Sequence, residues 1–280
     1  MKKLTILICA VLMSFSAYSQ LAVPQPSPAS KLKQTVGLTE VTVKYSRPSM
    51  RGRTIMGDLV PFDKIWRTGA NARTSISFSD DVTFGGTEVK AGTYAIFTKP
   101  GASSWEVYLH DIESGFGIPQ ELDASKVVAT ATAEVHSMEM PVETFTITID
   151  DLHNNGATLG LIWEKTYVGV PFGVPTMAKA DKSIEAVFGG PSGNDYFAAA
   201  NYYYSEKRDL DKAKKWIDKA VASNDKAFWM MRQQSLIYAA LGDKPGAIKA
   251  AKKSLEVAEA AGNADYVKMN KDSLKEWGAL

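Results

Sequence analysis

Cysteine is nearly absent from this sequence: Cys9 is the only one among 280 residues, and it lies in an apolar segment near the N-terminus. A single thiol forms no internal disulfide, and a cysteine-ligated metal site needs several. Stability must therefore come from packed apolar cores. With 45% hydrophobic and 22% charged residues, the composition is that of an ordinary globular protein.

Long apolar runs are also missing. The apolar run at residues 4–13 is shorter than the ~20 residues that a membrane-spanning helix needs. Two lysines precede it, and Ala17 and Ser19 match the −3 and −1 positions of a signal-peptidase site. We therefore expect a signal peptide over residues 1–19, a mature chain without a transmembrane segment, and a periplasmic or extracellular location.

There is no excess of charge of one sign. The chain has 32 basic and 31 acidic residues, and removal of the two lysines of the signal peptide leaves 30 against 31, a net charge of −1. Proteins that bind nucleic acids normally have a basic surplus that neutralises phosphates. The balance therefore argues against nucleic acid as a partner.

Motifs for nucleophilic catalysis or phosphate cradling are missing too. The sequence has no G-x-S-x-G elbow and no glycine-rich phosphate loop between a strand and a helix. Asp150 and Asp151 are adjacent on an expected strand, so their side chains point to opposite faces and cannot act as an acid–base pair. We identify no catalytic residue and no cofactor, and a non-catalytic function is favoured.

An enzymatic alternative depends on the few histidines. His110 lies on one expected strand, and Glu134 and His136 share a face of another. If these strands were neighbours, two imidazoles and a carboxylate could bind a divalent metal and support a metal-assisted hydrolase. The opposing interpretation is an exposed, solvated sheet face without metal.

A period of two dominates the first half of the chain. Val41, Val43 and Tyr45 alternate with polar residues, and the same alternation recurs in further short segments separated by glycine-containing turns. Such alternation is typical of strands with one buried face. We expect an antiparallel β-sandwich, jelly-roll or Ig-like, over residues 34–174, preceded by an extended proline-rich lead-in at residues 20–33.

A helical period replaces this pattern over residues 175–280, so the fold class is α+β with two parts. Tyr204, Ala213 and Ala220 are followed 34 residues later by Tyr238, Ala247 and Ser254. This spacing resembles the tetratricopeptide repeat. The expected helices cover residues 181–188, 194–206, 210–222, 227–241, 245–261 and 264–277.

Tyrosines in these helices suggest a surface for a protein or peptide partner. Tyr203, Tyr204 and Tyr238 are the candidates, because tyrosine is enriched at protein interfaces. The resemblance to tetratricopeptide arrays implies the same docking role. The alternative is that the helices only shield one face of the sheet.

An arginine-rich region lies between Tyr45 and Thr74 and is the main candidate binding site. The guanidinium fork binds carboxylates, phosphates and sulfates with two parallel hydrogen bonds, and binding residues are common on glycine-containing loops. The expected ligand is an anionic small molecule or glycan. The candidate residues are Arg47, Arg51, Arg53, Trp66, Arg67, Asn71 and Arg73.

The alternative for the same region is structural. The arginines would pair with Asp58, Asp63, Asp80 and Asp81, and would fasten a long loop to the β domain. Trp66 would then fill the core instead of stacking on a ligand.

Four motifs in the first half resemble a secreted bacterial family catalogued as a domain of unknown function, family 2911. They are S-R-P-S-M-R-G-R (46–53), G-D-L-V-P-F (57–62), W-R-T-G-A-N (66–71) and A-G-T-Y (91–94). The resemblance covers about residues 24–167, and the paired arginine motifs are fairly specific. It implies a β domain, often with a helical tail, and a secreted location, but no activity is assigned to the family's motifs.

Together these observations predict an exported, non-catalytic binding or scaffolding protein of the bacterial envelope. Its arginine-rich loop would bind an anionic group or glycan, and its helices would dock a protein partner. A metal-assisted hydrolase and a purely structural envelope protein are the alternatives.

Overall fold

The computed structural model describes residues 23–111, 117, 119, 121–187 and 190–280. The expected signal peptide and the first residues of the lead-in lie outside this range. The chain divides into two compact units, one ending at Thr176 and the other beginning at Met177. None of the described helices is long and apolar enough to span a bilayer.

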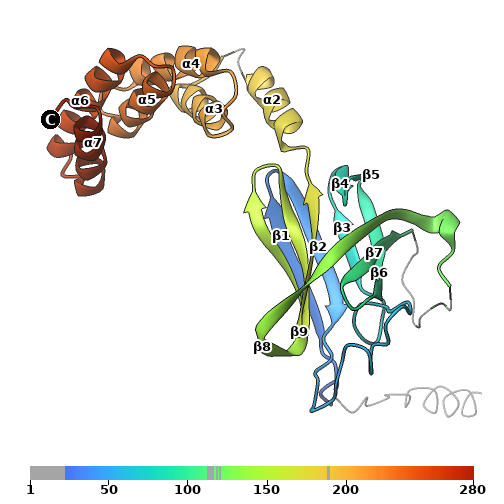
Figure 1. Cartoon of the computed structure of the whole chain (residues 1–280). Coiled ribbons are helices and arrows are strands. Elements are labelled where there is room, and N and C mark those ends of the chain that lie inside the picture. The colour runs from blue at the N-terminus through green and yellow to red at the C-terminus, as the bar shows by residue number, and fades with distance from the viewer. Residues whose placement is uncertain (1–22, 112–116, 118, 120, 188–189) are drawn as a thin grey trace, which may run out of the picture. The chain divides into compact units, whose positions relative to one another are not determined.

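In the described residues of the first unit, nine antiparallel strands form a sheet with the hydrogen-bonded order β1-β2-β3-β6-β7-β8-β9-β4-β5 (Figure 1). A short 3-10 helix, Ala124–Lys126, precedes β8. The strands are β1 (Ala29–Val36), β2 (Thr39–Ser46), β3 (Ser75–Phe78), β4 (Val82–Phe84), β5 (Thr87–Val89), β6 (Gly92–Pro100), β7 (Ser104–His110), β8 (Val127–His153) and β9 (Gly156–Gly173). The large antiparallel sheet confirms the β half of the expected fold class.

Strand β8 joins two groups of strands. Up to Glu134 it pairs with β7, and from Val135 onward it pairs with β9, with register shifts between Ser137 and Thr146. Figure 1 shows β8 curving from beside β7 to beside β9. Buried side chains from both groups form one continuous apolar core, because alternate residues of each strand point to the same side.

Strand β1 begins at Ala29, five residues before the expected start of the β domain, so the lead-in is shorter than expected. The reason is the weak alternation of an edge strand. Lys31 and Lys33 are exposed, whereas Leu32 on the opposite face is only half-buried. A half-buried apolar residue between lysines does not produce the strong pattern of an interior strand.

From Thr176 onward the described residues form six helices: α2 (Thr176–Val187), α3 (Gly193–Ser205), α4 (Leu210–Ser223), α5 (Phe228–Ala240), α6 (Lys244–Ala260) and α7 (Ala264–Glu276). Their bounds agree closely with the expected ranges, except that α2 begins five residues earlier. Ser192 caps α3 in a capping box with Asp195. Gly242 and Gly262, just after α5 and α6, have φ angles of +79° and +67°, which glycine adopts at little cost.

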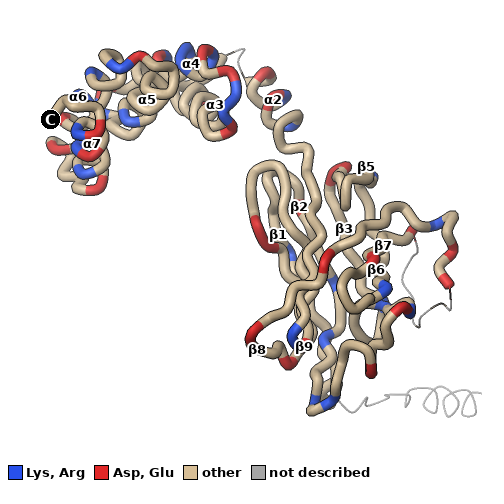
Figure 2. The backbone as a smooth tube through the Cα atoms, in the orientation of Figure 1, with Lys and Arg blue, Asp and Glu red and all other residues tan. Residues whose placement is uncertain are grey.

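Positions 34 residues apart are equivalent in their burial. Ala213 and Ala247 are fully buried, as are Ala220 and Ser254. These small residues let successive helices pack closely. In Figure 2 basic and acidic residues are interspersed along α3 to α7, so these helices present a surface of mixed charge.

Candidate anion-binding site

Arg47 fastens the segment after β2 to β8. Its Nε donates a hydrogen bond to the carbonyl oxygen of Phe145 at 3.0 Å, and its Nη2 donates to Oγ1 of Thr146 at 2.7 Å. Both acceptors are uncharged. Arg47 therefore holds two parts of the β unit together without neutralising its charge.

Arg51 and Asn71 hold the segment that precedes β1. Nη2 of Arg51 donates to the carbonyl oxygen of Pro26 at 2.8 Å, and Nδ2 of Asn71 donates to that of Ser27 at 3.0 Å. The backbone N–H of Arg47 adds a bond to the Pro28 carbonyl at 2.9 Å. The proline segment is thus tied to the arginine-rich region.

Arg53 binds its own loop. Its Nε and Nη2 donate to the carbonyl oxygens of Met50 and Ser49 at 2.8 and 2.7 Å. Among the residues that the structure describes, Arg47, Arg51 and Arg53 form no ion pair with an aspartate, and Asp81 pairs instead with Lys90 at 2.8 Å. These three arginines thus fasten parts of the β unit to one another, as the structural alternative expects. Their side-chain partners are carbonyl and hydroxyl oxygens, however, and not the aspartates that this alternative named.

Trp66 lies in the core of the β unit. It is only 8% exposed and packs edge-on against Trp105 and Phe145, and in a stacked arrangement against Trp163 with ring centroids 5.8 Å apart. Its backbone N–H donates to the Thr98 carbonyl at 2.7 Å. The structure thus gives Trp66 a packing role and places its ring away from the surface.

The loop after Trp66 leaves the edge of β6 and returns to it at Thr74, whose carbonyl accepts from the Ile96 N–H at 2.9 Å. Arg67 and Arg73 lie at its two ends. Nε of Arg67 is buried and has no hydrogen-bond partner within the described chain. Cζ of Arg73 lies 5.9 Å from the centre of the Phe97 ring.

Phe97 also contacts His110, with ring centroids 5.7 Å apart. Both side chains are buried, although Phe97 does not belong to the main core cluster. Burial lowers the pKa of His110, because the charged imidazolium loses hydration. The neutral imidazole is therefore the form that this environment favours.

A pocket of about 320 Å³ on β1 and β2 contains three cationic side chains. Lys31 and Lys44 are directly opposite each other in the β1–β2 pairing. Arg73 precedes β3, which pairs with β2 through Ser75 and Lys44. None of the eight described residues that line the pocket is acidic: Ala29, Ser30, Lys31, Lys44, Tyr45, Ser46, Ala72 and Arg73.

Neighbouring lysines on the same sheet face already have partners. Lys33 pairs with Glu40 at 2.5 Å, and Lys99 pairs with Glu106 at 3.2 Å. Lys31 and Lys44 form no ion pair among the residues that the structure describes. Among the described residues, no ion pair therefore neutralises these two lysines of the pocket.

The sequence contained a signal for the two lysines that the sequence analysis missed. A hairpin centred on Gly37 and Leu38 pairs residues whose numbers add to 75, and Lys31 and Lys44 satisfy this relation. The glycine at position 37 is the sequence signal for this turn. Its φ of +56° is a conformation that glycine adopts readily. Of the residues that the sequence predicted, Arg73 alone lines this pocket.

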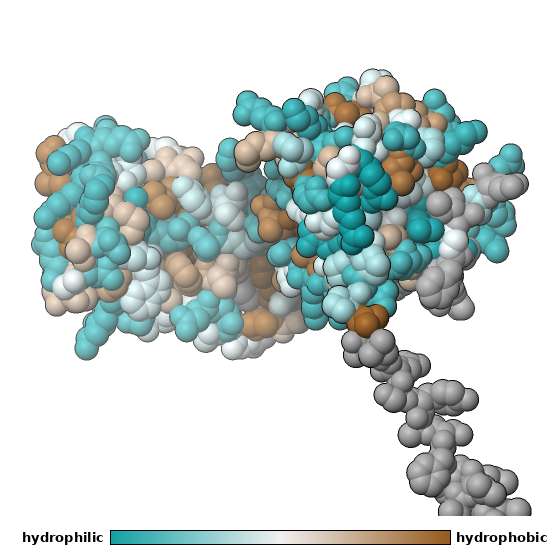
Figure 3. All heavy atoms as spheres, turned by 90° about the horizontal axis from the view of Figure 1, so that it is seen from below, coloured by the Kyte–Doolittle hydropathy of each residue, from teal (hydrophilic) through white to brown (hydrophobic). Residues whose placement is uncertain are grey.

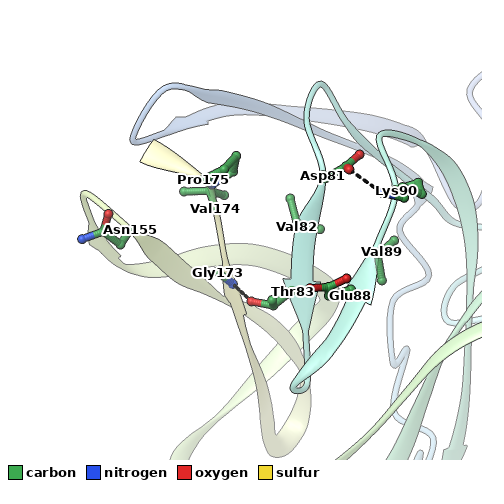
Figure 4. Close-up of a pocket in the computed structure, with 10 residues that line it drawn as sticks. All are labelled: Asp81, Val82, Thr83, Glu88, Val89, Lys90, Asn155, Gly173, Val174 and Pro175. Atoms are coloured by element: carbon green, nitrogen blue, oxygen red, sulfur yellow. Dashed lines mark hydrogen bonds and ion pairs between the residues drawn. The ribbon is translucent and has the colours of Figure 1, made fainter. Parts of the chain in front are cut away.

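A second pocket, of about 540 Å³, lies between the β4–β5 hairpin and the end of β9 (Figure 4). Its charged residues are Asp81, Glu88 and Lys90. The hydrogen bond from Lys90 holds the pKa of Asp81 below its usual value, so this carboxyl stays ionised. With two carboxylates and one amine, this larger pocket does not suit an anion.

The proposed metal ligands are far apart. His110 is opposite Val127, whereas Glu134 is opposite Ser104 at the other end of β7. Six residues of a strand span about 20 Å, so the two side chains cannot share an ion. No cluster of three metal-ligating side chains occurs in the described part of the chain. The alternative of a metal site at His110, Glu134 and His136 is therefore wrong, because the β7–β8 register separates its members.

The three candidate tyrosines differ in their surroundings. Tyr203 is buried, and its hydroxyl donates to Asp181 at 3.0 Å. The Tyr238 hydroxyl donates to Asp218 at 2.7 Å. Tyr204 lines a cavity of about 420 Å³ near the ends of α3 and α5. Of the three, Tyr204 is thus the one that lines a cavity among the described pockets.

Asp218 is the centre of a polar network between α4 and α5. Burial by itself raises the pKa of this carboxyl, but hydrogen bonds from Tyr238, Gln234 and Lys214 outweigh that effect and leave the pKa lowered. The carboxylate form is therefore the one that the helices hold. This network stabilises the helix pair, and the hydroxyl of Tyr238 is already hydrogen-bonded within it.

Comparison with known families gives the class of this protein. The β unit has a cationic surface pocket, and residues 27–172 match the family described as Protein of unknown function (DUF2911). The match covers just over half of the chain, which therefore belongs to this family. Searches of curated proteins and of solved structures found no match.

Proposed function

We propose that this protein is an exported, non-catalytic binding or scaffolding protein of the bacterial envelope. Its β unit, folded as a β-sandwich, binds an anionic group or glycan in the pocket formed by Lys31, Lys44 and Arg73. Its tetratricopeptide-like helices dock a protein partner. Of the arginines in the arginine-rich region, Arg73 belongs to this site. The other two cations of the site are lysines of the β1–β2 hairpin.

The like-charge pair across β1 and β2 is the observation that supports this proposal most strongly. Lysines directly opposite each other on one sheet face destabilise the pairing. Arg73 lines the same pocket, and none of the described lining residues is acidic. A bound anion would remove this repulsion, and therefore its binding is favoured by the fold itself.

The surface supports recognition of a polar ligand. On the face seen in Figure 3 hydrophilic side chains dominate, and hydrophobic ones are scattered among them. Large contiguous apolar patches usually mark hydrophobic interfaces. A charged group is therefore the better ligand for that face.

The docking role of the helices is supported by the cavity beside Tyr204. Leu210 and Ala240 give this cavity apolar lining, and Lys207 adds a cation to it. An apolar wall with one polar anchor suits a peptide side chain.

Isothermal titration calorimetry on the purified protein tests the anion site, with phosphate, sulfate and galacturonate as probes. We expect binding of at least one anion, weakening as ionic strength rises, and a loss of affinity of at least tenfold in Lys44→Ala. Lys33→Ala is the matched control, because Glu40 already neutralises that lysine. If no anion binds, or if both variants lose affinity equally, the protein is better regarded as a structural envelope component.

A further inference from the structure

We propose that Tyr204, Arg232 and Tyr266 form a carboxylate-binding site on the helical unit, which takes an aspartate or glutamate side chain of a partner peptide. The site draws on three helices, because Tyr204 belongs to α3, Arg232 to α5 and Tyr266 to α7. This inference rests on the proposed docking function of the helices and names the chemistry of the partner.

Arg232 is a half-buried cation whose guanidinium has no ion pair or hydrogen bond within the described part of the chain. Its Nη1 is buried, while the side chain as a whole remains partly exposed. Burial lowers the pKa of Arg232, because the charged form loses hydration. An uncompensated charge in such surroundings costs stability. An anion that reaches the exposed part of the guanidinium would therefore be bound favourably.

Two tyrosines lie near this guanidinium. Tyr204 and Tyr266 have the largest electrostatic effects on Arg232, and α5 contacts both α3 and α7. The Tyr266 ring packs edge-on against Phe228, with ring centroids 4.8 Å apart, and Phe228 lies one helical turn before Arg232 on the same face of α5. Neither tyrosine hydroxyl has a hydrogen-bond partner among the residues that the structure describes.

A carboxylate matches these three donors. The guanidinium fork donates two parallel hydrogen bonds to the two oxygens of a carboxylate. Each oxygen keeps a further lone pair, which can accept from a phenolic hydroxyl. Hydrogen bonds to an ionised group are also stronger than those between neutral groups. One carboxylate can therefore use the guanidinium and both hydroxyls.

The neighbouring acidic residues favour a ligand with a single negative charge. Asp272 and Glu276 of α7 also act on Arg232 through space, but neither forms an ion pair with it among the described residues. Asp272 pairs instead with Lys268 at 2.6 Å. A strongly acidic peptide or a phosphate dianion would be repelled by these two carboxylates. A lone aspartate or glutamate among uncharged residues therefore suits the site better.

The cavity beside Tyr204 favours a peptide over a small carboxylic acid. Tyr204 lines this cavity of about 420 Å³ together with Leu210 and Ala240, so an apolar side chain of the same ligand can bind next to the carboxylate. Figure 1 shows α5 between α3 and α7. A peptide that crosses these three helices passes over Arg232 with an internal residue, so a side chain and not the chain terminus supplies the carboxylate.

The experiment measures binding of the purified protein to synthetic octapeptides by fluorescence polarisation. The peptides are acetylated and amidated, so that their ends carry no charge, and each contains one leucine and one glutamate at varied separation. A matched peptide has glutamine in place of the glutamate. We expect glutamate peptides to bind and their glutamine counterparts to bind at least about tenfold more weakly, since hydrogen bonds to a charged group are lost.

Arg232→Met separates a binding role from a structural one. An apolar side chain in place of an unpaired, half-buried charge removes the cost of desolvation, so the melting temperature of the helices, followed by circular dichroism at 222 nm, should rise. The affinity for the best glutamate peptide should fall at least about tenfold. Lys249→Met, at an exposed position of α6, is the control and should retain that affinity. A lower melting temperature with unchanged peptide affinity in Arg232→Met overturns the inference.

The double variant with Tyr204→Phe and Tyr266→Phe tests the two hydroxyls while keeping both rings. Because these hydroxyls have no partner within the described residues, we expect an unchanged melting temperature and a severalfold loss of affinity for the glutamate peptide. Full affinity in the double variant would remove both tyrosines from the site and contradict the inference.

The remaining outcomes separate this inference from the proposed docking function. If glutamate and glutamine peptides bind equally well, the helices dock a peptide through its apolar residue and only the inference fails. If binding requires a free C-terminal carboxylate, docking stands and the assignment to a side chain is wrong. If no peptide binds, the docking function and the inference fail together.

Discussion

Lys31 of β1 and Lys44 of β2 are directly opposite each other in the antiparallel pairing of these strands. Two like charges at such a position oppose strand pairing, and neither has an acidic partner among the residues that the structure describes. The hairpin therefore gives up some stability to hold two cations beside Arg73. A trade-off of this kind is common at binding sites, where local strain or repulsion serves function.

Lys31→Glu should make this trade-off visible. The substitution turns a repulsive cross-strand pair into an attractive one, which is worth up to about 1 kcal/mol. We expect a higher free energy of unfolding in urea and a loss of anion affinity of at least tenfold. Lys33→Gln, two residues along the same face, should lose its exposed ion pair with Glu40 at a cost below about 1 kcal/mol and keep the affinity. A less stable Lys31→Glu protein would contradict the argument.

Trp66→Ala should destabilise the β unit strongly. The ring is buried among Trp105, Phe145 and Trp163, and removing such a large buried aromatic costs about 3–5 kcal/mol. Urea unfolding followed by tryptophan fluorescence measures the change. Phe62→Ala is a suitable control, because Phe62 is 38% exposed and should cost much less. A loss below about 1 kcal/mol for Trp66→Ala would show that the ring is not a core element.

Arg51→Ala should loosen the chain before β1 with little effect on global stability. The lost bond to the Pro26 carbonyl is exposed, so we expect a change below about 1.5 kcal/mol. Amide hydrogen exchange at Ser27 and Ala29 should become faster. Arg53→Ala removes the same charge, but Arg53 donates to the carbonyl oxygens of Met50 and Ser49 and not to that of Pro26, so exchange at these amides should stay as in the wild type. Equal effects of both variants would mean that charge, not the bond, holds the segment.

His110 should make the β unit less stable in mildly acidic solution. Its folded pKa lies below the ordinary value of 6.5 because of burial, so the unfolded chain takes up the proton first. Stability from neutral His110 is therefore complete above about pH 6.5 and decreases as the pH falls from there towards the lowered pKa. The melting temperature should fall less between pH 7 and pH 5 in His110→Gln than in the wild type. Exposed His136→Gln should retain the wild-type slope.

Asp181 and Arg208 should stabilise the helical unit down to low pH. Two guanidinium nitrogens donate to the two carboxylate oxygens at 2.8 and 2.7 Å, and these bonds hold the pKa of Asp181 below 3.8. The stabilisation is thus present above about pH 4 and is lost as the pH falls through the lowered pKa. Asp181→Asn should cost about 1–3 kcal/mol at pH 7, measured by circular dichroism at 222 nm.

Lys268→Ala is the control for that experiment. Its pair with Asp272, at 2.6 Å, is exposed on one helix, and because solvent screens such a pair it should contribute little to stability. The wild type should lose more stability than Asp181→Asn between pH 5 and pH 3. If the two lose stability in parallel, the ion pair does not shape the acid response.

The sequence by itself determined the elements whose signals are local. Alternation at Val41, Val43 and Tyr45 predicted β2, and the helical period placed α3 to α7 to within one residue at each end. These signals depend on neighbours a few positions away, so no knowledge of the fold is needed. The arginine motifs also identified the family.

Only the tertiary structure decided which residues meet. The β1–β2 register placed Lys31 opposite Lys44, the β7–β8 register separated His110 from Glu134, and core packing withdrew Trp66 from the surface. Strand order and register follow from long-range hydrogen bonding and from which face becomes buried. A register shift by one residue would move every side chain of the strand to the opposite face of the sheet. Residue type and spacing thus suggested the chemistry of the site, whereas the pairing of distant strands decided which residues form it.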